Sequence, residues 1–413
     1  PVADILWYLG DEIDHKPDQY GDYPYSNQFD YCNTDVLLNR IEARGGKAVT
    51  PEGLEYRVIW IPDNYRMHSA TLRKLISLAE SGVHVVAERP VGPASISEDD
   101  VDGFNALVDM LWSSSNVIEG KSIYEALDAL GIVPDVTCRI DSMPEKTTNG
   151  GRPVWMHRSV EGADWYFVAA PKYCGFKGEM SFASEGVAQI WDPVSGEIAA
   201  AASSADGRGR TSIGFDLPRC GSCFVVFRHD VTGTPYSGLQ AGLVDDAASL
   251  PGYVASTEIT SPWTLSFPGG WGAPEIVRLS ELKSWTELGY GEEASAFSGT
   301  ASYATTFRMK RQKGMAYMLD LGNVEMIAEV KVNGVAFKPL WNTPYRVDVT
   351  SALRSGKNLI EIDVTDSWYN RLAFDAGQPE SRRKTWTIGG PKAGDALRPS
   401  GLIGPVKMVT VRQ

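Results

Sequence analysis

The sequence predicts a multidomain protein in which an α/β region precedes two regions built from β-strands. The chain has 413 residues, enough for about two to four domains of ordinary size. Over residues 1–134 short apolar runs alternate with amphipathic stretches, whereas from residue 135 apolar side chains recur at every second position. We therefore predict an α/β domain at 1–134, a β-sandwich at 135–230, a linker at 231–252 and a second β-sandwich at 253–413.

The elements of the α/β region follow from turn residues and caps. The apolar run Asp4–Gly10 ends in glycine, and Arg57–Ile61 is followed by Pro62. The stretch Ser69–Glu80 carries apolar side chains at helical spacing and stops before Gly82. The alternation of strands and helices predicts a parallel, doubly wound sheet. In chain order we predict strand Asp4–Gly10, helix Asn33–Arg44, strand Arg57–Ile61, helix Ser69–Glu80, strand Val83–Ala87, helix Ser97–Ser113, strand Val117–Glu119 and helix Ser122–Leu130.

The two β regions are predicted from period-two patterning and from turn signals. The run Asp192–Gly196 (DPVSG) is a turn between two strands. The pair Asn333-Gly334 between Val332 and Val335 is a strong hairpin signal. The predicted strands are Asp164–Ala169, Val187–Trp191, Ser212–Leu217, Ser222–Arg228, Ala301–Met309, Glu329–Val335 and Leu359–Val364.

Composition excludes some classes of function. A net charge of −13 argues against a nucleic-acid partner, because binding to phosphates requires a positive surface. No apolar run reaches the ~20 residues of a membrane-spanning helix, so we expect no membrane partner. Twelve tryptophans and seventeen tyrosines suit either large sandwich cores or stacking on sugars, with core packing the first expectation. The chain starts at Pro1 without a signal peptide pattern, which predicts a start at a domain boundary and assigns no compartment.

The five cysteines leave at least one thiol unpaired and do not form a disulfide framework. Cys220 and Cys223 have the spacing of redox and zinc motifs. A zinc site needs a second ligand pair, and only His229 is near in sequence. A redox pair usually opens a helix, whereas these residues enter a predicted strand. We interpret them as small residues at a strand start and predict no metal ligand in this chain.

The third region resembles the sugar-binding-like jelly-roll domain of large glycoside hydrolases. Five stretches carry the resemblance in the same order as in those domains. They are GTASYATTF (Gly299–Phe307), LDLGNVEMIAEVKVNG (Leu319–Gly334), WNTPYRVDVTSALRSGKNLIEIDV (Trp341–Val364), DSWYNRL (Asp366–Leu372) and SGLIGPVKM (Ser400–Met408). The resemblance implies a galactose-binding-like fold for this region.

The earlier regions are similar to the C-terminal half of glycoside hydrolase family 106, which contains α-L-rhamnosidases. The matching runs are YCNTDVLLNR (Tyr31–Arg40), the stretch Leu54–Val86, DWYFVA (Asp164–Ala169) and WDPVSGEI (Trp191–Ile198). The resemblance implies a parent enzyme that hydrolyses terminal α-L-rhamnosyl linkages with inversion. It also implies calcium at the catalytic site, a rhamnose-containing glycan as substrate, and a secreted or periplasmic location of the parent.

The resemblance does not extend to a catalytic domain. The family's (β/α)8 barrel, with its acid and base carboxylates, lies N-terminal to these domains, and nothing in this chain matches it. We therefore expect an accessory region that braces or completes the missing barrel, with no catalytic residue and no cofactor of its own. The alternative is a stand-alone carbohydrate-binding protein without catalysis.

The first domain resembles a flavodoxin-like class I glutamine amidotransferase, but it lacks the nucleophile of that class. That chemistry needs a cysteine on a sharp strand-to-helix turn, whereas Glu88 follows the strand Val83–Ala87. Asp11 and Glu12 follow the first strand, at the edge where α/β sheets bind ligands. They are candidates for the edge of a neighbouring pocket, and the alternative is a solvated polar loop.

The candidate contact segment runs from Trp368 to Trp386. We predict that its first residues end a strand and that a long polar loop follows, a position where rigid sandwiches make contacts. Three roles stay open for this segment: docking on the missing barrel, contact with sugar, and packing of both tryptophans in the core. The candidate residues are Trp368, Tyr369, Asn370, Arg371, Arg383 and Trp386.

Overall fold

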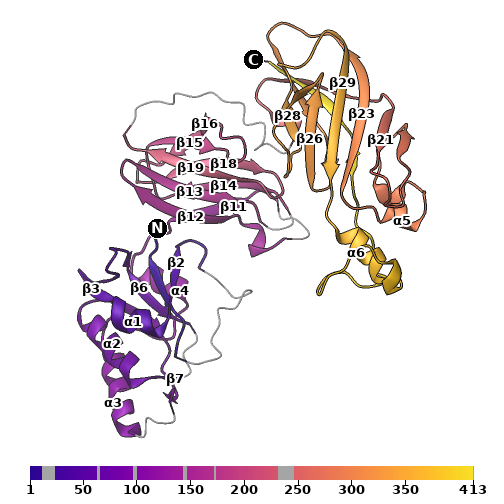
Figure 1. Ribbon diagram of the computed structural model, residues 1–413. Coiled ribbons are helices and arrows are strands. Elements are labelled where there is room, and N and C mark those ends of the chain that lie inside the picture. The colour runs from indigo at the N-terminus through magenta and orange to yellow at the C-terminus, as the bar shows by residue number, and fades with distance from the viewer. Residues whose placement is uncertain are drawn as a thin grey trace.

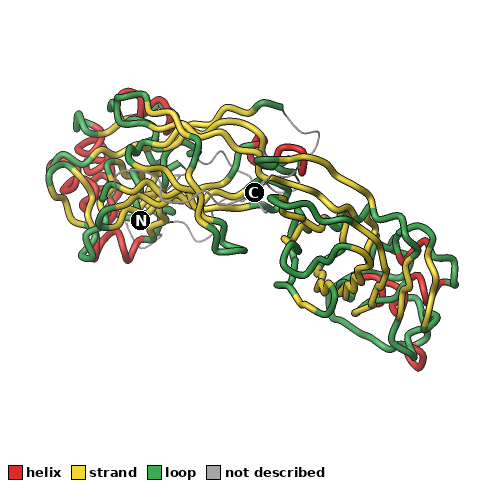
Figure 2. The backbone as a smooth tube through the Cα atoms, turned by 90° about the horizontal axis from the view of Figure 1, so that it is seen from above, coloured by secondary structure: helices red, strands yellow, loops and turns green. Residues whose placement is uncertain are grey.

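The computed structural model describes residues 1–11, 24–62, 66–95, 100–142, 147–171, 174–230 and 246–412. The candidate Glu12 and residues 231–245 of the predicted linker lie outside these ranges. The described residues form a parallel-sheet part (β1 to α4), a first sandwich (β11 to β19) and a second sandwich (β20 to β31). The first sandwich lies between the other two parts (Figure 1, Figure 2). This arrangement confirms the predicted fold class of an α/β region followed by two β-sandwiches.

The parallel sheet has the strand order β10-β8-β6-β1-β2. Numbered along the chain, this is the 2-1-3-4-5 order of flavodoxin-like folds. Helices α1 to α3 pack on one face and α4 on the other. The strands are β1 (Ile5–Tyr8), β2 (Phe29–Cys32), β6 (Val58–Ile61), β8 (His84–Ala87) and β10 (Val117–Ile118), and the helices are α1 (Thr34–Arg40), α2 (Ser69–Glu80), α3 (Val101–Trp112) and α4 (Ile123–Ala129).

Local capping explains where these helices begin. The Asn33 side chain accepts from the backbone N–H of Val36 at the start of α1, and Ser122 forms a capping box with Glu125 at the start of α4. Both starts agree with the sequence prediction. The predicted helix 33–44 is too long, because α1 ends at Arg40 and the chain then enters a small antiparallel sheet. That sheet contains β3 (Glu42–Arg44), β4 (Lys47–Val49) and β5 (Glu55–Tyr56), and one further pair is β7 (Arg66–Met67) with β9 (Gly92–Pro93).

The first sandwich consists of two antiparallel sheets around an aromatic core. The core includes Tyr166, Phe182 and Phe227, which are fully buried. The predicted turn Asp192–Gly196 connects β15 and β16, with the Gly196 N–H donating to the Asp192 carbonyl. One sheet has β11 (Val136–Ile140), β14 (Phe176–Phe182), β18 (Thr211–Leu217) and β17 (Ser203–Ala205), and the other has β12 (Val154–Val160), β13 (Ala163–Ala169), β19 (Ser222–Arg228), β15 (Val187–Trp191) and β16 (Ile198–Ala200).

The second sandwich packs a four-stranded sheet on a six-stranded sheet. The turn Asn333-Gly334 joins β26 to β27 with both residues at positive φ, which confirms the predicted hairpin. The four-stranded sheet has β20 (Tyr253–Glu258), β31 (Lys407–Arg412), β24 (Met315–Asp320) and β28 (Arg346–Asp348). The six-stranded sheet has β22 (Ile276–Leu279), β21 (Trp263–Ser266), β23 (Thr300–Met309), β29 (Gly356–Thr365), β26 (Ile327–Val332) and β27 (Val335–Ala336).

The segment that follows β29 corrects the sequence prediction. Residues Trp368 to Arg371 do not end a strand: Trp368 directly precedes α6 (Tyr369–Ala376), which projects from one end of the second sandwich (Figure 1). Further short elements of this sandwich are α5 (Glu292–Ser295) and the pair β25 (Asn323–Val324) with β30 (Leu402–Gly404). Short 3₁₀ turns lie at Asn149–Gly151, Ala247–Ser249, Trp285–Glu287 and Glu380–Arg382. No described helix is long and apolar enough to cross a membrane.

Candidate functional site

The α6 segment, residues 368–399, is built on a buried arginine. The Arg371 guanidinium is 1% exposed and donates two hydrogen bonds to the Asp375 carboxylate, at 3.0 and 2.8 Å. A third hydrogen bond of 3.0 Å joins it to Glu293 of α5. The same guanidinium lies 5.5 Å from the centre of the Trp271 ring, within cation–π range. Arg371 therefore fastens α6 to the body of the sandwich.

The neighbouring loop is held by the same carboxylate. Asp375, which is fully buried, also accepts from the backbone N–H groups of Lys384 and Thr385, at 3.0 and 2.7 Å. Burial alone would raise the pKa of the Asp375 carboxyl, but the hydrogen bonds from Arg371 and Thr385 together exceed that effect and hold the pKa below its usual range. The far end of the loop is fixed by Asn370, whose side-chain amide both donates to and accepts from the backbone of Arg398 at 2.8 Å.

The candidate residues of this segment therefore divide into a fixed base and an exposed face. Trp368 is 46% exposed and Trp386 is 73% exposed, so the alternative in which both tryptophans pack in the core is wrong. Tyr369 lies under the guanidinium of Arg398, 3.5 Å from the ring centre. Arg383 donates to the Gln378 carbonyl just beyond α6. The sequence pattern could not tell the supporting residues of this segment from the surface ones.

Asp366, directly before α6, has a perturbed carboxyl group that the sequence did not single out. Burial raises its pKa to about 6, and the nearby Glu325 acts in the same direction. The Ser367 backbone N–H opposes this shift by donating to the Asp366 carboxylate at 2.6 Å. A carboxyl that titrates near neutral pH can exchange protons there. The base of the α6 segment therefore carries a group whose charge changes close to neutrality.

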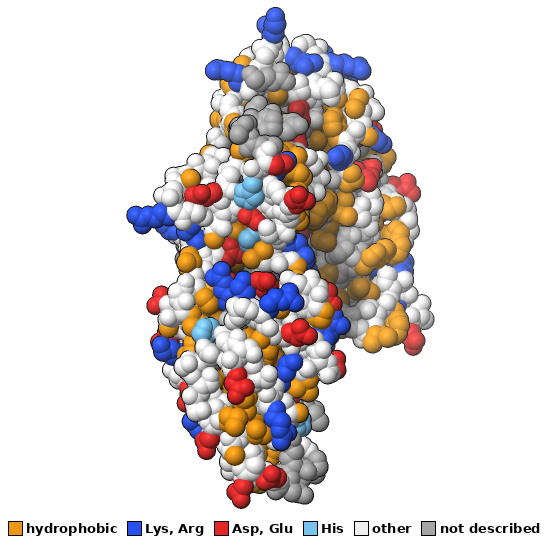
Figure 3. All heavy atoms as spheres, turned by 90° about the vertical axis from the view of Figure 1, so that its left-hand side faces the viewer, with side chains coloured by type: hydrophobic (Ala, Val, Ile, Leu, Met, Phe, Trp, Pro, Cys, Tyr) orange, Lys and Arg blue, Asp and Glu red, His pale blue; other side chains and the backbone are white. Residues whose placement is uncertain are grey.

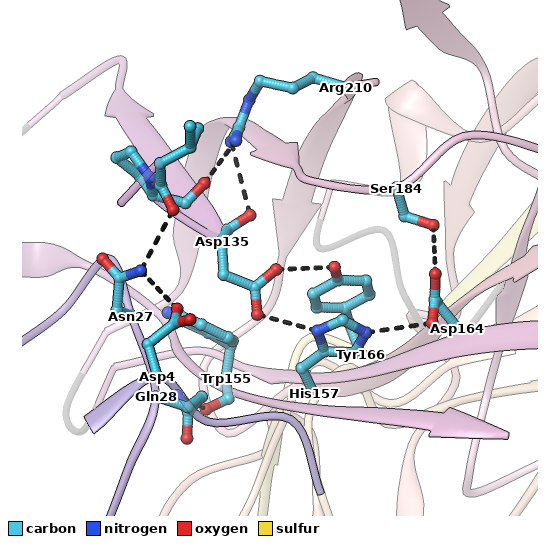
Figure 4. Close-up of polar contacts among 12 residues, drawn as sticks. Asp4, Asn27, Gln28, Asp135, Trp155, His157, Asp164, Tyr166, Ser184 and Arg210 are labelled. Atoms are coloured by element: carbon cyan, nitrogen blue, oxygen red, sulfur yellow. Dashed lines mark hydrogen bonds and ion pairs between the residues drawn. The ribbon is translucent and has the colours of Figure 1, made fainter. Parts of the chain in front are cut away.

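A buried polar network lies in the first sandwich, and sequence reasoning missed it. His157 of β12 is placed between two aspartates, with its Nδ1 2.8 Å from Asp135 and its Nε2 3.3 Å from Asp164. Tyr166 stacks on the imidazole at 4.0 Å between ring centres and donates a 2.8 Å hydrogen bond to Asp135. Ser184 donates a hydrogen bond to the carboxylate of Asp164 (Figure 4). The spacing of these residues along the chain follows no known motif.

Burial and neighbouring side chains shift the pKa values of the charged groups in this network. Burial lowers the pKa of His157, but hydrogen bonds and attraction to the two carboxylates exceed that effect and raise it to about 9. The pKa of Asp164 is held well below its usual range, chiefly by His157. At neutral pH His157 is therefore a buried cation between two carboxylates. Because Ser184 donates to a carboxylate and not to the imidazole, the group lacks the serine–histidine contact of a hydrolytic triad.

The same network joins the first sandwich to the parallel-sheet part. The Asp135 backbone N–H donates to the Ser26 carbonyl at 2.8 Å. The Gln28 amide and the Trp155 carbonyl form a 2.9 Å hydrogen bond, and the Trp155 indole donates to the Tyr25 carbonyl at 3.0 Å. In Figure 4, Asn27 of the parallel-sheet part donates to the side chain of Asp4 and to the Val133 carbonyl, and Gln28 donates to the Trp155 carbonyl beside this group. We infer that the network stabilises the junction between the two parts.

Asp11 lies at the carboxyl end of β1, where the strand order reverses. Its Oδ1 accepts from the hydroxyls of Tyr8, Thr34 and Thr71, at 2.5, 2.9 and 3.1 Å. Its Oδ2 accepts from the backbone N–H of His68, the residue before α2, at 2.9 Å. Both oxygens of the Asp11 carboxylate therefore accept hydrogen bonds from residues of the same domain. In this structure Asp11 connects β1 to the starts of two helices.

Cys220 and Cys223 differ in their exposure to solvent. Cys223 is fully buried on β19, and burial raises its pKa to about 12, whereas Cys220 is exposed in the preceding turn. Across the described residues, no three histidine, cysteine or acidic side chains gather in a cluster that could hold a metal ion.

This division predicts selective thiol chemistry. In the native protein, Cys220 should react with a disulfide reagent such as dithionitrobenzoate far faster than Cys223, because only thiolates attack and, of these two thiols, only that of Cys220 is exposed. The measurement is the time course of native modification with peptide mapping. Cys220→Ser should remove the fast phase, and Cys223→Ser should leave it unchanged. Equal protection of both thiols in the native chain would contradict the assignment.

The exposed surface of the parallel-sheet part and the first sandwich carries charges of both signs. In Figure 3, acidic and basic side chains are interspersed over this face. The net charge of −13 therefore does not come from one acidic block on the face that this view shows.

Comparison with known proteins gives two family matches. Residues 1–204 match the family model of glycoside hydrolase 106, described as alpha-L-rhamnosidase. Residues 289–399 match a glycosyl hydrolase 2 galactose-binding domain-like model. The second match contains the α6 segment, so this segment belongs to the galactose-binding-like domain.

Individual relatives agree with these matches. A rhamnosidase structure from Novosphingobium sp. PP1Y matches 99% of this chain and 39% of its own, at 29% identity and a TM-score of 0.75. A protein from Formosa agariphila named "Putative beta-glucuronidase" is 34% identical over 211 residues, which are 42% of this chain and 18% of that protein. This chain thus spans well under half the length of either relative. The chain is similar to rhamnosidase- and glucuronidase-like glycoside hydrolases, with a match to the family 106 model over residues 1–204 and to a galactose-binding-like model over residues 289–399.

Proposed function

We propose that this chain is the accessory region of a glycoside hydrolase that cleaves terminal α-L-rhamnosyl linkages, and that it braces the catalytic domain. The proposal rests on the share of each chain that the structural match covers: 99% of this chain corresponds to only 39% of the Novosphingobium rhamnosidase. The remaining part of such an enzyme would supply the acid and base carboxylates. Calcium, where the enzyme needs it, would be bound in that catalytic part.

The α6 segment is the surface that we propose for this contact. Its base is fixed by the buried pair Arg371 and Asp375, whereas Trp368, Trp386 and Ile388 are 46%, 73% and 93% exposed. Exposed aromatic and aliphatic side chains on a rigid support are typical of interaction surfaces. Burial of these side chains against a catalytic domain would stabilise the complex at little cost in conformational entropy, because the segment is already ordered.

An activity assay separates the accessory role from catalysis. The purified chain should show no hydrolysis of 4-nitrophenyl α-L-rhamnoside, with or without calcium. The positive control is an intact rhamnosidase under the same conditions. Turnover that survives repurification of this chain would overturn the accessory role and would direct attention to Asp366 and Glu325 as carboxylates near the α6 segment.

A binding assay tests the docking surface. We would co-produce this chain with the part of the Novosphingobium rhamnosidase that the match leaves uncovered and measure co-purification. We expect a complex that the double variant Trp368→Ala, Trp386→Ala weakens at least tenfold, because large exposed aromatic side chains dominate such contacts. Trp341→Ala, which removes another exposed tryptophan, is the matched control and should bind normally. An unchanged complex in the double variant would exclude this surface.

The alternative function is carbohydrate binding without catalysis. It predicts saturable sugar affinity in a chain that neither turns over a rhamnoside nor forms a complex with a catalytic domain. The two assays above therefore distinguish the alternatives, since only the accessory role requires the complex.

A further inference from the structure

A cavity of about 740 Å³ lies between the two sandwiches. One wall is the turn after β15, with Asp192, Ser195 and Glu197, and the start of β19. The other wall is the loop from Phe337 to Pro344 together with β28. Its volume lies within the ~300–1,000 Å³ of small-molecule sites. Neither the family matches nor the proposed docking surface assigns a role to this cavity.

The cavity is held open by fixed side chains. Lys338 Nζ donates to the Ser195 carbonyl at 3.3 Å, and the Thr343 hydroxyl donates to the Arg219 carbonyl. These two hydrogen bonds cross from one sandwich to the other. Arg346 on the wall is buried and donates to Asp320 through two nitrogens, at 3.0 and 2.8 Å. The walls are therefore positioned before any ligand enters.

The lining combines an aromatic surface with hydrogen-bond acceptors. Trp341 is 58% exposed and, with Phe337, provides flat apolar area. Asp192 is occupied within its own turn, because its carboxylate accepts from the Val194 N–H and the Ser195 hydroxyl, at 2.8 and 2.7 Å. By contrast, the side-chain carboxylate of Glu197 accepts no hydrogen bond from the described residues, although its backbone carbonyl accepts from the Asp192 N–H at 2.9 Å.

The charges of the lining restrict what can bind. Burial and the nearby carboxylates of Asp192 and Asp348 raise the pKa of Glu197, while Lys338 lowers it. Three carboxylates face a single lysine ammonium, since the Arg346 guanidinium is paired with Asp320. An anionic ligand such as a phosphate or a uronic acid would be repelled. A neutral polyol could stack a ring face on Trp341 and donate hydroxyl hydrogens to Glu197 and Asp348.

We propose that this cavity is a binding site for a neutral sugar residue of a glycan, with Trp341 as the stacking surface and Glu197 as an acceptor for sugar hydroxyls. The choice of a glycan draws on the similarity of the chain to glycoside hydrolases. It does not require the bracing role, because the cavity is formed entirely within this chain. The site would hold a glycan beside the catalytic domain or, in the alternative function, would be the binding site itself.

The test uses the whole chain with three defined probes: methyl α-L-rhamnoside, methyl β-D-galactoside and methyl β-D-glucuronide. Saturation-transfer NMR and calorimetric titration should show saturable binding of at least one neutral glycoside. The glucuronide should bind at least tenfold more weakly, because its carboxylate faces those of the cavity. Trp341→Ala and the isosteric Glu197→Gln should each weaken binding of the neutral glycoside, the first at least tenfold.

The control is Trp386→Ala, which removes an exposed tryptophan of the α6 segment and should leave the affinity unchanged. Thermal unfolding checks that each variant is folded, as expected for exposed side chains. Absence of binding to both neutral probes, equal binding of the glucuronide, or unchanged affinity in Trp341→Ala would overturn the proposal. Loss of binding in Trp386→Ala alone would place the sugar on the α6 segment. Failure of the complex with a catalytic domain would overturn the bracing role without affecting this result.

Discussion

Replacing Asp375 by alanine should destabilise the second sandwich by roughly 3–5 kcal/mol, the cost of breaking a buried ion pair by removing one partner. Arg371 would remain almost completely buried with only Glu293 as an acceptor. The loop would also lose the carboxylate that binds the backbone of Lys384 and Thr385. At roughly 2–4 °C per kcal/mol for a domain of this size, the calorimetric transition of this sandwich should fall by roughly 6–20 °C.

Glu292→Ala is the matched control for this variant. Glu292 is an exposed carboxylate in α5, next to the Glu293 that contacts Arg371. Its removal should cost less than about 1 kcal/mol, the usual size of an exposed charge effect at a helix start. Hydrogen exchange should rise over residues 377–399 in the Asp375 variant and stay unchanged in the control. Equal transitions in both variants would show that the buried pair does not hold the segment.

Replacing His157 by alanine should destabilise the first sandwich by a similar amount, roughly 3–5 kcal/mol. The variant leaves Asp135 and Asp164 facing each other without the cation between them, and it removes the ring that stacks on Tyr166. The junction with the parallel-sheet part should loosen as well, because Asp135, directly before β11, donates its backbone N–H to the Ser26 carbonyl there. Calorimetry reports the stability, and hydrogen exchange at Ser26 to Gln28 reports the junction.

His229→Ala is the control, since His229 lies 3.2 Å from the same Asp164 but its side chain is 43% exposed. Partial exposure screens this ion pair, so we expect a loss of less than about 1 kcal/mol. A His229 variant as unstable as the His157 variant would place the important contact at the surface and not in the core.

The His157 network also predicts a pH dependence. The folded state raises the pKa of His157 from 6.5 to about 9, so the protonated form binds more strongly to its neighbours in the folded chain. This contribution is fully present below about pH 6.5 and disappears as the pH rises through about 9. The shift corresponds to roughly 3 kcal/mol. The folded state lowers the pKa of Asp164, and its contribution is present above about pH 4 and is lost on acidification.

Thermal unfolding at pH 6, 7.5 and 9.5 measures this dependence. The unmodified chain and His229→Ala should lose stability between pH 6.5 and 9.5, whereas His157→Ala should lose much less. The comparison with His229→Ala removes contributions from other groups that titrate in the alkaline range. An identical alkaline loss in all three proteins would show that His157 is not the responsible group.

The sequence by itself determined those features that depend on neighbouring residues. Asn33 and Ser122 mark helix starts because a short polar side chain caps the N–H groups two or three residues later. Asn333-Gly334 marks a hairpin because both residues tolerate positive φ. Period-two patterning located many of the sandwich strands, and sequence motifs indicated the resemblance to glycoside hydrolases. The strand β2 was missed because Phe29–Cys32 mixes polar and aromatic residues at a sheet edge. The domain boundaries and the binding roles of the candidate residues stay predictions.

Only the tertiary structure decided which polar residues are buried and which aromatic side chains are exposed on the surface. The segment after Asp366 forms a helix because Arg371 finds Asp375 one turn away and Glu293 from another element, a pairing between residues 78 positions apart. His157 becomes a buried cation only because folding places Asp135 and Asp164 on either side of it. The cavity beside Trp341 exists only where two sandwiches meet. Burial and charge pairing depend on contacts between distant parts of the chain, and local sequence patterns do not contain that information.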